Sequence, residues 1–346
     1  MRLHGLLSLI ALSCACTNRG TPRERLMGVS HPASAGQASG APILVPTIAF
    51  TSTRDSNWEI YLMNSDGTDQ RRMTQNDVGD GFANLSPDGT WIVFDSNRRR
   101  ATGEPVNTSD LFLMRADGSE QVFLTRGSSA TWSPDGRFIA FHRSASGTGQ
   151  PIKIDPGSAT VDSDIFVARI EDLKKGLAPT NITNSADWID DDPDWSPDGR
   201  RIAFTRHAVT DSQHNSITAE IYVMNADGTG LTRLTTNAEE ERSPAWSPDG
   251  RRIVYSCRKG SNGTFETCVM SADGSRQQRL STNDEQDLSA TFSPDGTKIL
   301  FQRRVDGAPQ LFSMNADGTN PIQLTSGPGL NVLAHWGVLR VHVKED

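Results

Sequence analysis

Short apolar runs recur along the whole chain, and the same turn residues separate them. Residues 130–141 read ATWSPDGRFIAF, and the Ser-Pro-Asp-Gly phrase with an apolar run after it begins at Ser86, Ser133, Ser196, Ser247 and Ser293. A second phrase alternates with the first, as in IYVMNADGT from Ile221. Proline fixes φ at the second position of such a turn, and glycine accepts the positive φ that a tight hairpin needs. The pattern therefore predicts β-hairpins, and it assigns the repeated aspartates to turns.

Each repeat divides into four predicted strands. The first ends in the residues before Ser-Pro-Asp-Gly, the second is the apolar run after it, the third is the IYVMN-like phrase, and the fourth is a short run before a Thr or Ser. The second strand occurs six times, around Ile48, Ile92, Ile139, Ile202, Ile253 and Ile299. Residues 165–169 supply a degenerate third strand for the third repeat. Repeats of this length predict a radial array of small sheets.

The two ends of the chain are predicted to complete one repeat together. The first repeat starts directly at its second strand, in residues 46–50, and so lacks a first strand. Residues 333–337 have the missing pattern, with Trp336 where other repeats have Trp132, Trp195 and Trp246. We therefore expect an all-β, six-bladed β-propeller of four-stranded antiparallel blades, closed by a C-terminal strand that joins the N-terminal blade. Residues 338–343 then form either a further edge strand or an extension of the closing strand.

The WSPDG, IAF, IYVMNADG and RLT phrases resemble the WD-like repeat of TolB-type six-bladed β-propellers across residues 43–340. This resemblance implies a bacterial cell-envelope scaffold that contacts an envelope protein or a polysaccharide or peptidoglycan-associated partner. The repeat is also similar to those of hydrolase-associated and sugar-lyase propellers. The third repeat departs from the pattern at residues 171–173, and Trp336-Gly337 lacks Ser-Pro-Asp-Gly. TolB also has a separate N-terminal α/β domain, where this sequence has a short tether.

The N-terminal residues predict export. Residues 1–16, MRLHGLLSLIALSCAC, combine Arg2 with a short apolar core and small residues, which is typical of a secretory signal. The segment also resembles a bacterial lipoprotein signal, in which Cys16, or alternatively Cys14, becomes the lipidated residue. Residues 17–42 are predicted to be a disordered tether, and residues 43–343 the propeller. We expect a monomer, periplasmic or anchored to the outer membrane, that meets the membrane only through its lipid.

The two remaining cysteines, Cys257 and Cys268, fall on neighbouring strands of one predicted hairpin. An exported protein meets an oxidising compartment, which favours a disulfide between them. Two buried thiols are the alternative.

Acidic residues precede the first strand of several repeats, which would place them at one mouth of the ring. The net charge of −8 argues against nucleic acid as a partner. These predicted binding residues are Asp187, Trp188, Asp190, Asp191, Asp192, Glu239, Glu240, Glu241, Asp284, Glu285 and Asp287. One interpretation is a Ca²⁺ or cationic-ligand site, because Ca²⁺ takes six to eight oxygen ligands. The other is a solvated surface, so no cofactor is assigned.

The predicted topology separates a uniform turn face from a face of variable loops. The longest loops span residues 97–110, 143–164 and 206–220, and variable loops on a rigid scaffold commonly carry binding sites. The sequence contains no G-x-S-x-G, H-E-x-x-H or G-x-x-x-x-G-K-[ST] motif. We therefore expect a non-enzymatic scaffold. The alternative is a calcium-dependent polysaccharide lyase or hydrolase that acts at the acidic mouth.

Overall fold

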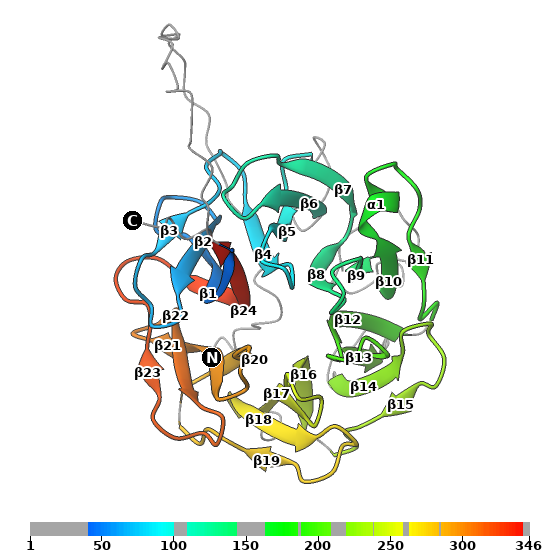
Figure 1. The fold of residues 1–346 in the computed structure, drawn as a ribbon. Helices are drawn as coiled ribbons and strands as arrows, with labels where there is room; N and C mark the ends of the chain where they lie inside the picture. Colours follow the sequence, from blue (N-terminus) through cyan, green and yellow to red (C-terminus); the bar gives the residue numbers. More distant parts are fainter. Residues whose placement is uncertain are drawn as a thin grey trace, which may run out of the picture.

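Four-stranded antiparallel sheets stand around a common axis like the blades of a propeller (Figure 1). The computed structural model describes residues 41–99, 109–143, 163–185, 188–208, 219–237, 239–258, 263–283 and 285–341. Within these ranges there are six such sheets, and each has its first strand nearest the axis. The predicted six-bladed β-propeller is confirmed.

The strands of each blade follow one another from the axis outwards. Blade 1 contains β24 (Asn331–Val341), β1 (Ile43–Ser52), β2 (Glu59–Asn64) and β3 (Arg71–Arg72). Blade 2 contains β4 (Asp80–Leu85), β5 (Trp91–Ser96), β6 (Asp110–Arg115) and β7 (Val122–Arg126). Blade 3 contains β8 (Ser128–Trp132), β9 (Phe138–Arg143), β10 (Asp164–Arg169) and β11 (Thr180–Asn181), with helix α1 (Ile170–Leu173) between its last two strands.

The other three blades have the same order. Blade 4 contains β12 (Trp188–Trp195), β13 (Arg201–Ala208), β14 (Ala219–Asn225) and β15 (Thr232–Arg233). Blade 5 contains β16 (Glu240–Trp246), β17 (Arg252–Arg258), β18 (Phe265–Ser271) and β19 (Gln278–Arg279). Blade 6 contains β20 (Asp287–Phe292), β21 (Lys298–Val305), β22 (Ala308–Asn315) and β23 (Ile322–Gln323).

The predicted ring closure is confirmed by the strand register. Trp336 of β24 pairs with Ile48 of β1. The other inner strands repeat this pairing, in the pairs Leu85–Ile92, Trp132–Ile139, Trp195–Ile202, Trp246–Ile253 and Phe292–Ile299. Residues 338–341 continue β24 along β1 as far as Val341 opposite Ile43, so they extend the closing strand rather than form a separate one.

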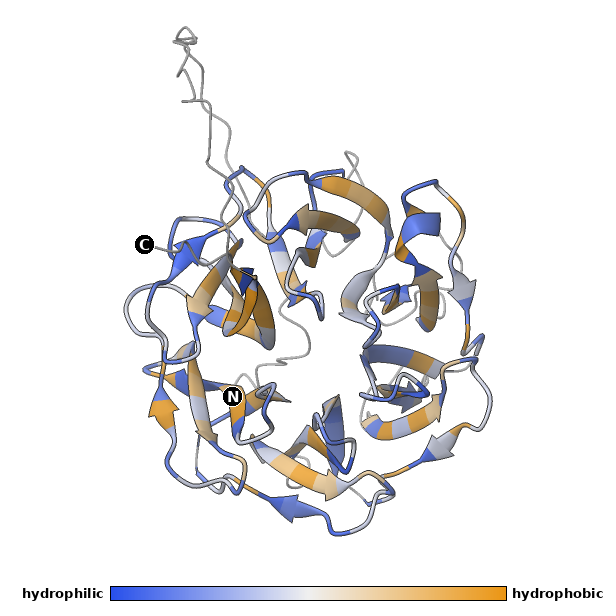
Figure 2. Cartoon of the chain, in the orientation of Figure 1, coloured by the Kyte–Doolittle hydropathy of each residue, from blue (hydrophilic) through white to orange (hydrophobic). Residues whose placement is uncertain are grey.

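The hydrophobic core lies between neighbouring blades. One cluster joins Ile48 and Trp336 of blade 1 to Leu300 and Leu311 of blade 6. Apolar positions concentrate in the strands and polar ones in the connections (Figure 2). Burial of each large apolar side chain contributes roughly 2 kcal/mol, so every joint between blades depends on both of its neighbours.

The turn interpretation of the repeated aspartates is supported by their hydrogen bonds. In all five Ser-Pro-Asp-Gly turns the serine hydroxyl donates to the aspartate at 2.6 Å and accepts a backbone N–H at 2.9 Å. The residue that closes each repeat also has a structural role. In blade 1 the hydroxyl of Thr74 accepts the backbone N–H of Ile60 at 3.0 Å, and Thr235 and Thr325 accept equivalent bonds. The repeat therefore encodes hairpins and their cross-strand anchors.

Three further expectations concern single segments. Cys257 of β17 and Cys268 of β18 form a disulfide, with Cα atoms 5.9 Å apart. The expected signal, the tether to residue 40 and the lipidated cysteine lie outside the described residues. Within the described ranges, no helix is long and apolar enough to cross a membrane.

Candidate functional site

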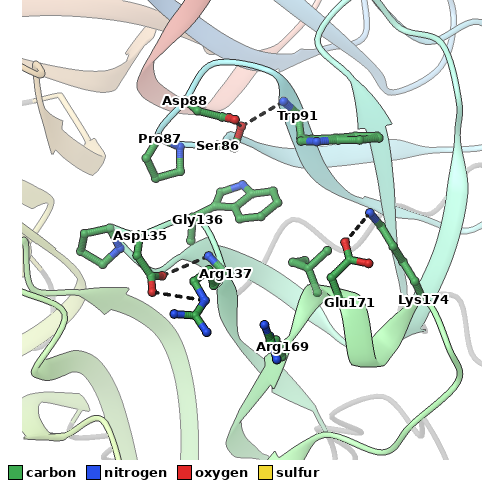
Figure 3. A pocket seen from close by; sticks show the side chains of 13 residues that line it. Ser86, Pro87, Asp88, Trp91, Asp135, Gly136, Arg137, Arg169, Glu171 and Lys174 are labelled. Atoms are coloured by element: carbon green, nitrogen blue, oxygen red, sulfur yellow. Dashed lines mark hydrogen bonds and ion pairs between the residues drawn. The ribbon is translucent and has the colours of Figure 1, made fainter.

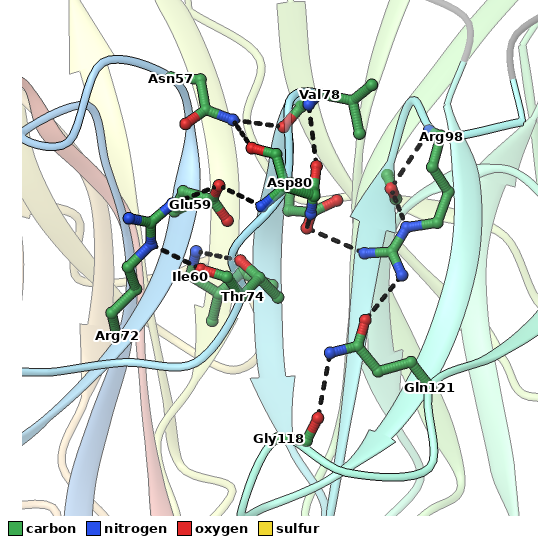
Figure 4. Close-up of polar contacts among 12 residues, drawn as sticks. Asn57, Glu59, Ile60, Arg72, Thr74, Val78, Asp80, Arg98, Gly118 and Gln121 are labelled. Atoms are coloured by element: carbon green, nitrogen blue, oxygen red, sulfur yellow. Dashed lines mark hydrogen bonds and ion pairs between the residues drawn. The ribbon is translucent and has the colours of Figure 1, made fainter. Parts of the chain in front are cut away.

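The acidic residues that begin the inner strands are held by arginines of the same blade. Asp190 accepts two hydrogen bonds from Arg206, at 2.6 and 2.7 Å, and Arg303 donates two to Asp287, both at 2.7 Å. Figure 4 shows the equivalent contact in blade 2, where Arg98 donates to Asp80 at 2.9 Å. These carboxylates are buried and occupied, so they serve the blades rather than a free ring of ligand oxygens.

Each of these arginines also lies over aromatic rings of its blade. The guanidinium of Arg206 lies 5.4 Å from the ring centre of Phe204 and 5.3 Å from that of Tyr222. Arg303 has the same relation to Phe301 and Phe312, at 5.0 and 5.3 Å. Stacking fixes the guanidinium plane, and the carboxylate then meets it edge-on.

The remaining predicted residues of the mouth have varied environments. Glu240 contacts Arg242 and Arg258, and Glu239 accepts a bond from Arg279 at 2.6 Å. Burial raises the pKa of Glu241 to about 7, and repulsion from Glu220 adds to this shift. Two residues of the set are exposed, Glu285 and Trp188. Asp187 and Asp284 lie outside the described residues.

The inner strand of blade 4 differs from the other five in its charge. After the ion-paired Asp190, β12 carries three more acidic residues, Asp191, Asp192 and Asp194. Figure 2 colours much of this strand as hydrophilic. The register aligns these positions with fifteen residues of the other described inner strands, and none of them is acidic: Gly81, Phe82, Asn84, Ser128, Ser129, Thr131, Arg242, Ser243, Ala245, Leu288, Ser289, Thr291, Val332, Leu333 and His335.

Asp191 and Asp192 make different contacts although they are adjacent. The Nε2 atom of His207 lies 3.2 Å from Asp191 Oδ2, and His207 and His142 help to lower the pKa of Asp191 against the effect of its burial. Asp192 accepts a hydrogen bond from the Ser243 hydroxyl of blade 5 at 2.8 Å. Burial and the neighbouring Asp191 raise the pKa of Asp192. The two carboxyl groups are therefore shifted in opposite directions.

Asp194 connects three blades. It accepts the backbone N–H of Trp246 in blade 5 at 2.7 Å and the hydroxyl of Thr131 in blade 3 at 3.2 Å. Burial raises its pKa to about 7, and these hydrogen bonds oppose only part of that shift. We call Asp191, Asp192, Asp194, His207 and Ser243 the axial cluster.

A β-bulge in every inner strand positions this cluster. The bulge residue has positive φ in each blade, between 48° and 53°, at Phe82, Ser129, Asp192, Ser243, Ser289 and Leu333. The ladder shifts there by one residue, as it does between Asp191 and Asp194. In blade 5 the N–H of Ser243 donates to the hydroxyl of Thr205 in blade 4 at 3.0 Å, so the bulge also joins neighbouring blades.

The axial cluster can accept a cationic group. Three carboxylates lie on one strand, and none of them forms a described ion pair with Lys or Arg. Among the described residues there is no group of three His, Cys, Asp or Glu side chains arranged to hold a metal ion. The sequence identified Asp191 and Asp192 from their acidic run but missed Asp194, His207 and Ser243, because strand register alone brings these residues together.

The sequence also missed a pocket on the turn face. Figure 3 shows it between the Ser-Pro-Asp-Gly turns of blades 2 and 3, with Arg169, Glu171 and Lys174 along one side. The only sequence signal was the departure of the third repeat at residues 171–173.

Comparison with known proteins supports the class that the fold defines. The TolB beta propeller domain family matches residues 242–339. The structure of TolB from Acinetobacter baumannii superposes with a TM-score of 0.63 at 17% identity, and covers 84% of this chain and 66% of that one. A TolB-type protein from Agrobacterium tumefaciens gives a TM-score of 0.59 at 20% identity, with 87% and 100% covered. The chain is therefore a six-bladed β-propeller, and its residues 242–339 match the TolB beta propeller domain family that the repeats resemble.

Known proteins with similar sequences support this likeness, but they do not identify an activity. An uncharacterized protein of Agrobacterium fabrum is 28% identical over 206 residues, which are 57% of this chain and 60% of that protein. Dipeptidyl-peptidase 5 of Porphyromonas gingivalis is 33% identical over 67 residues, 19% of this chain and 10% of the enzyme. The chain thus matches less than two thirds of either relative. An oligogalacturonate lyase from Vibrio parahaemolyticus shares the fold, with a TM-score of 0.52 at 14% identity, 80% of this chain and 73% of that one covered.

Proposed function

We propose that this protein is an exported, lipid-anchored scaffold that binds a protein or envelope polymer at the loop end of the propeller axis. The axial cluster carries this proposal, because β12 has three carboxylates beyond its ion-paired Asp190, whereas β16 has only Glu241 beyond its ion-paired Glu240. The ligand presents a cationic group, such as a lysine, an arginine or an amine, to Asp191 and Asp192. The scaffold itself catalyses no reaction.

The electrostatics of the cluster favour such a ligand. A cation beside Asp192 would offset the repulsion from Asp191 that raises the Asp192 pKa. Binding would therefore release protons, and affinity should increase from pH 6 to pH 8 as Asp194, whose pKa is raised to about 7, ionises. Trp188, 36% exposed and 5.5 Å from the Arg206 guanidinium, offers an aromatic contact at the start of the same strand.

Capture from a bacterial envelope extract tests the proposal. The immobilised protein should retain a specific partner, and the D191N/D192N variant should lose at least about tenfold of that capture. The matched control is D227N/D317N, which removes two exposed turn carboxylates and keeps the same net charge as the first variant. Equal capture by both variants would show that the axial cluster is not the binding site.

A calcium titration separates this proposal from the enzymatic alternative. A calcium-dependent lyase or hydrolase at the same mouth requires an ion, and an ion bound to the folded state raises the melting temperature. We expect no rise at millimolar calcium and no cleavage of acidic polysaccharides. A clear rise accompanied by product formation would replace the scaffold with an enzyme.

A further inference from the structure

The pocket on the turn face exists because blade 3 breaks a packing rule that the other blades follow. In those blades the glycine of the Ala-Asp-Gly or Ser-Asp-Gly turn lies against a backbone carbonyl of the preceding blade. A side chain has no room there, since a Cβ on Gly228 would lie 2.4 Å from Ile182 O, and one on Gly274 2.8 Å from Leu234 O. In blade 3, Asp172 stands at the glycine position, and helix α1 replaces the turn.

The backbone enters this helix as it enters the turns elsewhere. Ile170 N–H donates to Arg137 O at 3.0 Å, as Ala226 N–H donates to Arg200 O at 2.9 Å in blade 4. The chain diverges only after this point, and a cavity of about 470 Å³ remains beside α1. This volume lies within the range of small-ligand sites, about 300–1,000 Å³.

The contact between blades 2 and 3 has a tryptophan at the position where two other contacts between blades have an arginine. Between blades 4 and 5, Arg201 lies 4.7 Å from the ring centre of Trp246, and between blades 5 and 6 Arg252 lies 5.0 Å from that of Phe292. The equivalent residue in blade 2 is Trp91, which lines the pocket together with Trp132 of blade 3. This joint therefore has two tryptophans, and the Arg115 guanidinium and the Lys174 ammonium lie 4.0 and 4.9 Å from the ring centre of Trp91.

The acids of the pocket have short contacts within their own turn or helix, whereas the arginine side chains have at most one long contact to a carboxylate. Asp135 accepts the Ser133 hydroxyl at 2.6 Å and the Arg137 N–H at 3.0 Å within its own turn, and Glu171 pairs with Lys174 at 2.9 Å. The nearest described carboxylate to the Arg137 side chain is Asp135, at 4.0 Å. Arg169 is exposed, and among the described residues no carboxylate lies within ion-pair distance of it.

We propose that this pocket binds an acidic sugar unit beside Trp91, with its carboxylate or phosphate against Arg137 and Arg169. Arginine recognises either anion through paired N–H donors. The rim carboxylates of Asp88 and Glu171 can accept hydrogen bonds from sugar hydroxyls, which an aromatic anion would not supply. None of the residues that line this pocket belongs to the axial cluster, and the site does not depend on the proposed function.

Calorimetric titration and tryptophan fluorescence test the site with three probes, which are glucuronate, glucose 6-phosphate and glucose. We expect saturable binding of at least one anionic probe, about tenfold tighter than glucose, with a change in emission. The R137Q/R169Q variant should lose this preference. The R200Q/R251Q variant is the matched control, because both residues follow the glycine of Ser-Pro-Asp-Gly turns in other blades.

The probes also identify the anion. Preference for glucuronate assigns a carboxylate sugar, and preference for glucose 6-phosphate assigns a phosphorylated one. Three results would overturn the site: no saturable binding at about 10 mM of any probe, equal binding of glucose, or equal loss in R200Q/R251Q. Unchanged melting temperatures of both variants ensure that a loss of binding is not a loss of folding.

Discussion

Asp194 and Asp198 are four residues apart in sequence, yet the fold treats their carboxyl groups in opposite ways. Asp198 belongs to the exposed Ser-Pro-Asp-Gly turn of blade 4. It accepts the Ser196 hydroxyl at 2.6 Å and the Arg200 N–H at 3.0 Å, and these bonds lower its pKa. Asp194 lies on the inner strand, and burial raises its pKa to about 7. The turn stabilises the ionised form of Asp198, whereas burial on the inner strand disfavours the ionised form of Asp194.

This difference distinguishes the aspartates that the repeated turn requires from those that it does not require. Aspartates equivalent to Asp198 recur in four other Ser-Pro-Asp-Gly turns, and each is explained by hydrogen bonds of its own turn. Asp194 has no acidic equivalent in the other described inner strands, and its ionisation costs stability at neutral pH. A costly charge that the repeat does not require is expected where a ligand is bound.

Both regions depend on a closed ring, so removal of the closing strand gives the largest expected effect. Deletion of residues 331–346 removes β24, including the buried Val332 and Trp336, and exposes the edge of β1. We expect loss of cooperative thermal unfolding, and aggregation through the free strand edge. Circular dichroism and calorimetry measure this directly. The control deletes only residues 342–346, beyond β24, and should melt like the parent; a sharp parental transition in the longer deletion would contradict closure.

The Asp194→Asn substitution tests the cost of the axial charge. A buried acid with a raised pKa weakens folding increasingly as the pH rises from about 4, its unfolded value, to about 7, its folded value. The variant should therefore be more stable than the parent at pH 8, by about 2 kcal/mol, and nearly equal to it at pH 4. Urea unfolding at the two pH values measures the difference. A destabilised variant at pH 8 would show that the ionised carboxylate supports the fold.

The blade architecture could be predicted from the sequence because each of its signals is local and repeated. The turn residues, the isoleucine of the second strand and Trp336 all keep fixed places relative to their hairpins, and the register confirms those places. The arginine partners of the inner-strand acids do not keep a fixed place. Arg98 follows its isoleucine by six residues, whereas Arg206 and Arg303 follow theirs by four. The ion pairs between these arginines and the inner-strand acids therefore have no constant spacing in the sequence by which they could have been predicted.

The sites could be predicted only in part, because residues of several blades form them. Asp191 and Asp192 were visible as an acidic run, but Ser243 and Thr131 reach the axial cluster from the neighbouring blades. The turn-face pocket needs Trp91 of blade 2 beside α1 of blade 3. A broken repeat marks such a place in the sequence, but the chemistry of the pocket depends on packing between blades.

The smallest expected effect comes from the turn itself. Asp198→Asn weakens the bonds from Ser196 and Arg200, and the exposed site limits the loss to about 0.5 kcal/mol at pH 7. The sign of its pH dependence is opposite to that of Asp194→Asn. A lowered pKa stabilises the fold above the unfolded pKa of about 4, and this contribution disappears as the pH falls through the folded pKa. The free energies of unfolding of the parent and Asp198→Asn should therefore become equal below pH 4. The free energies of the parent and Asp194→Asn also become equal there. If instead both variants shifted stability in the same direction at pH 8, the contrast between turn and axis would fail, and the axial acids would be structural like those of the turns.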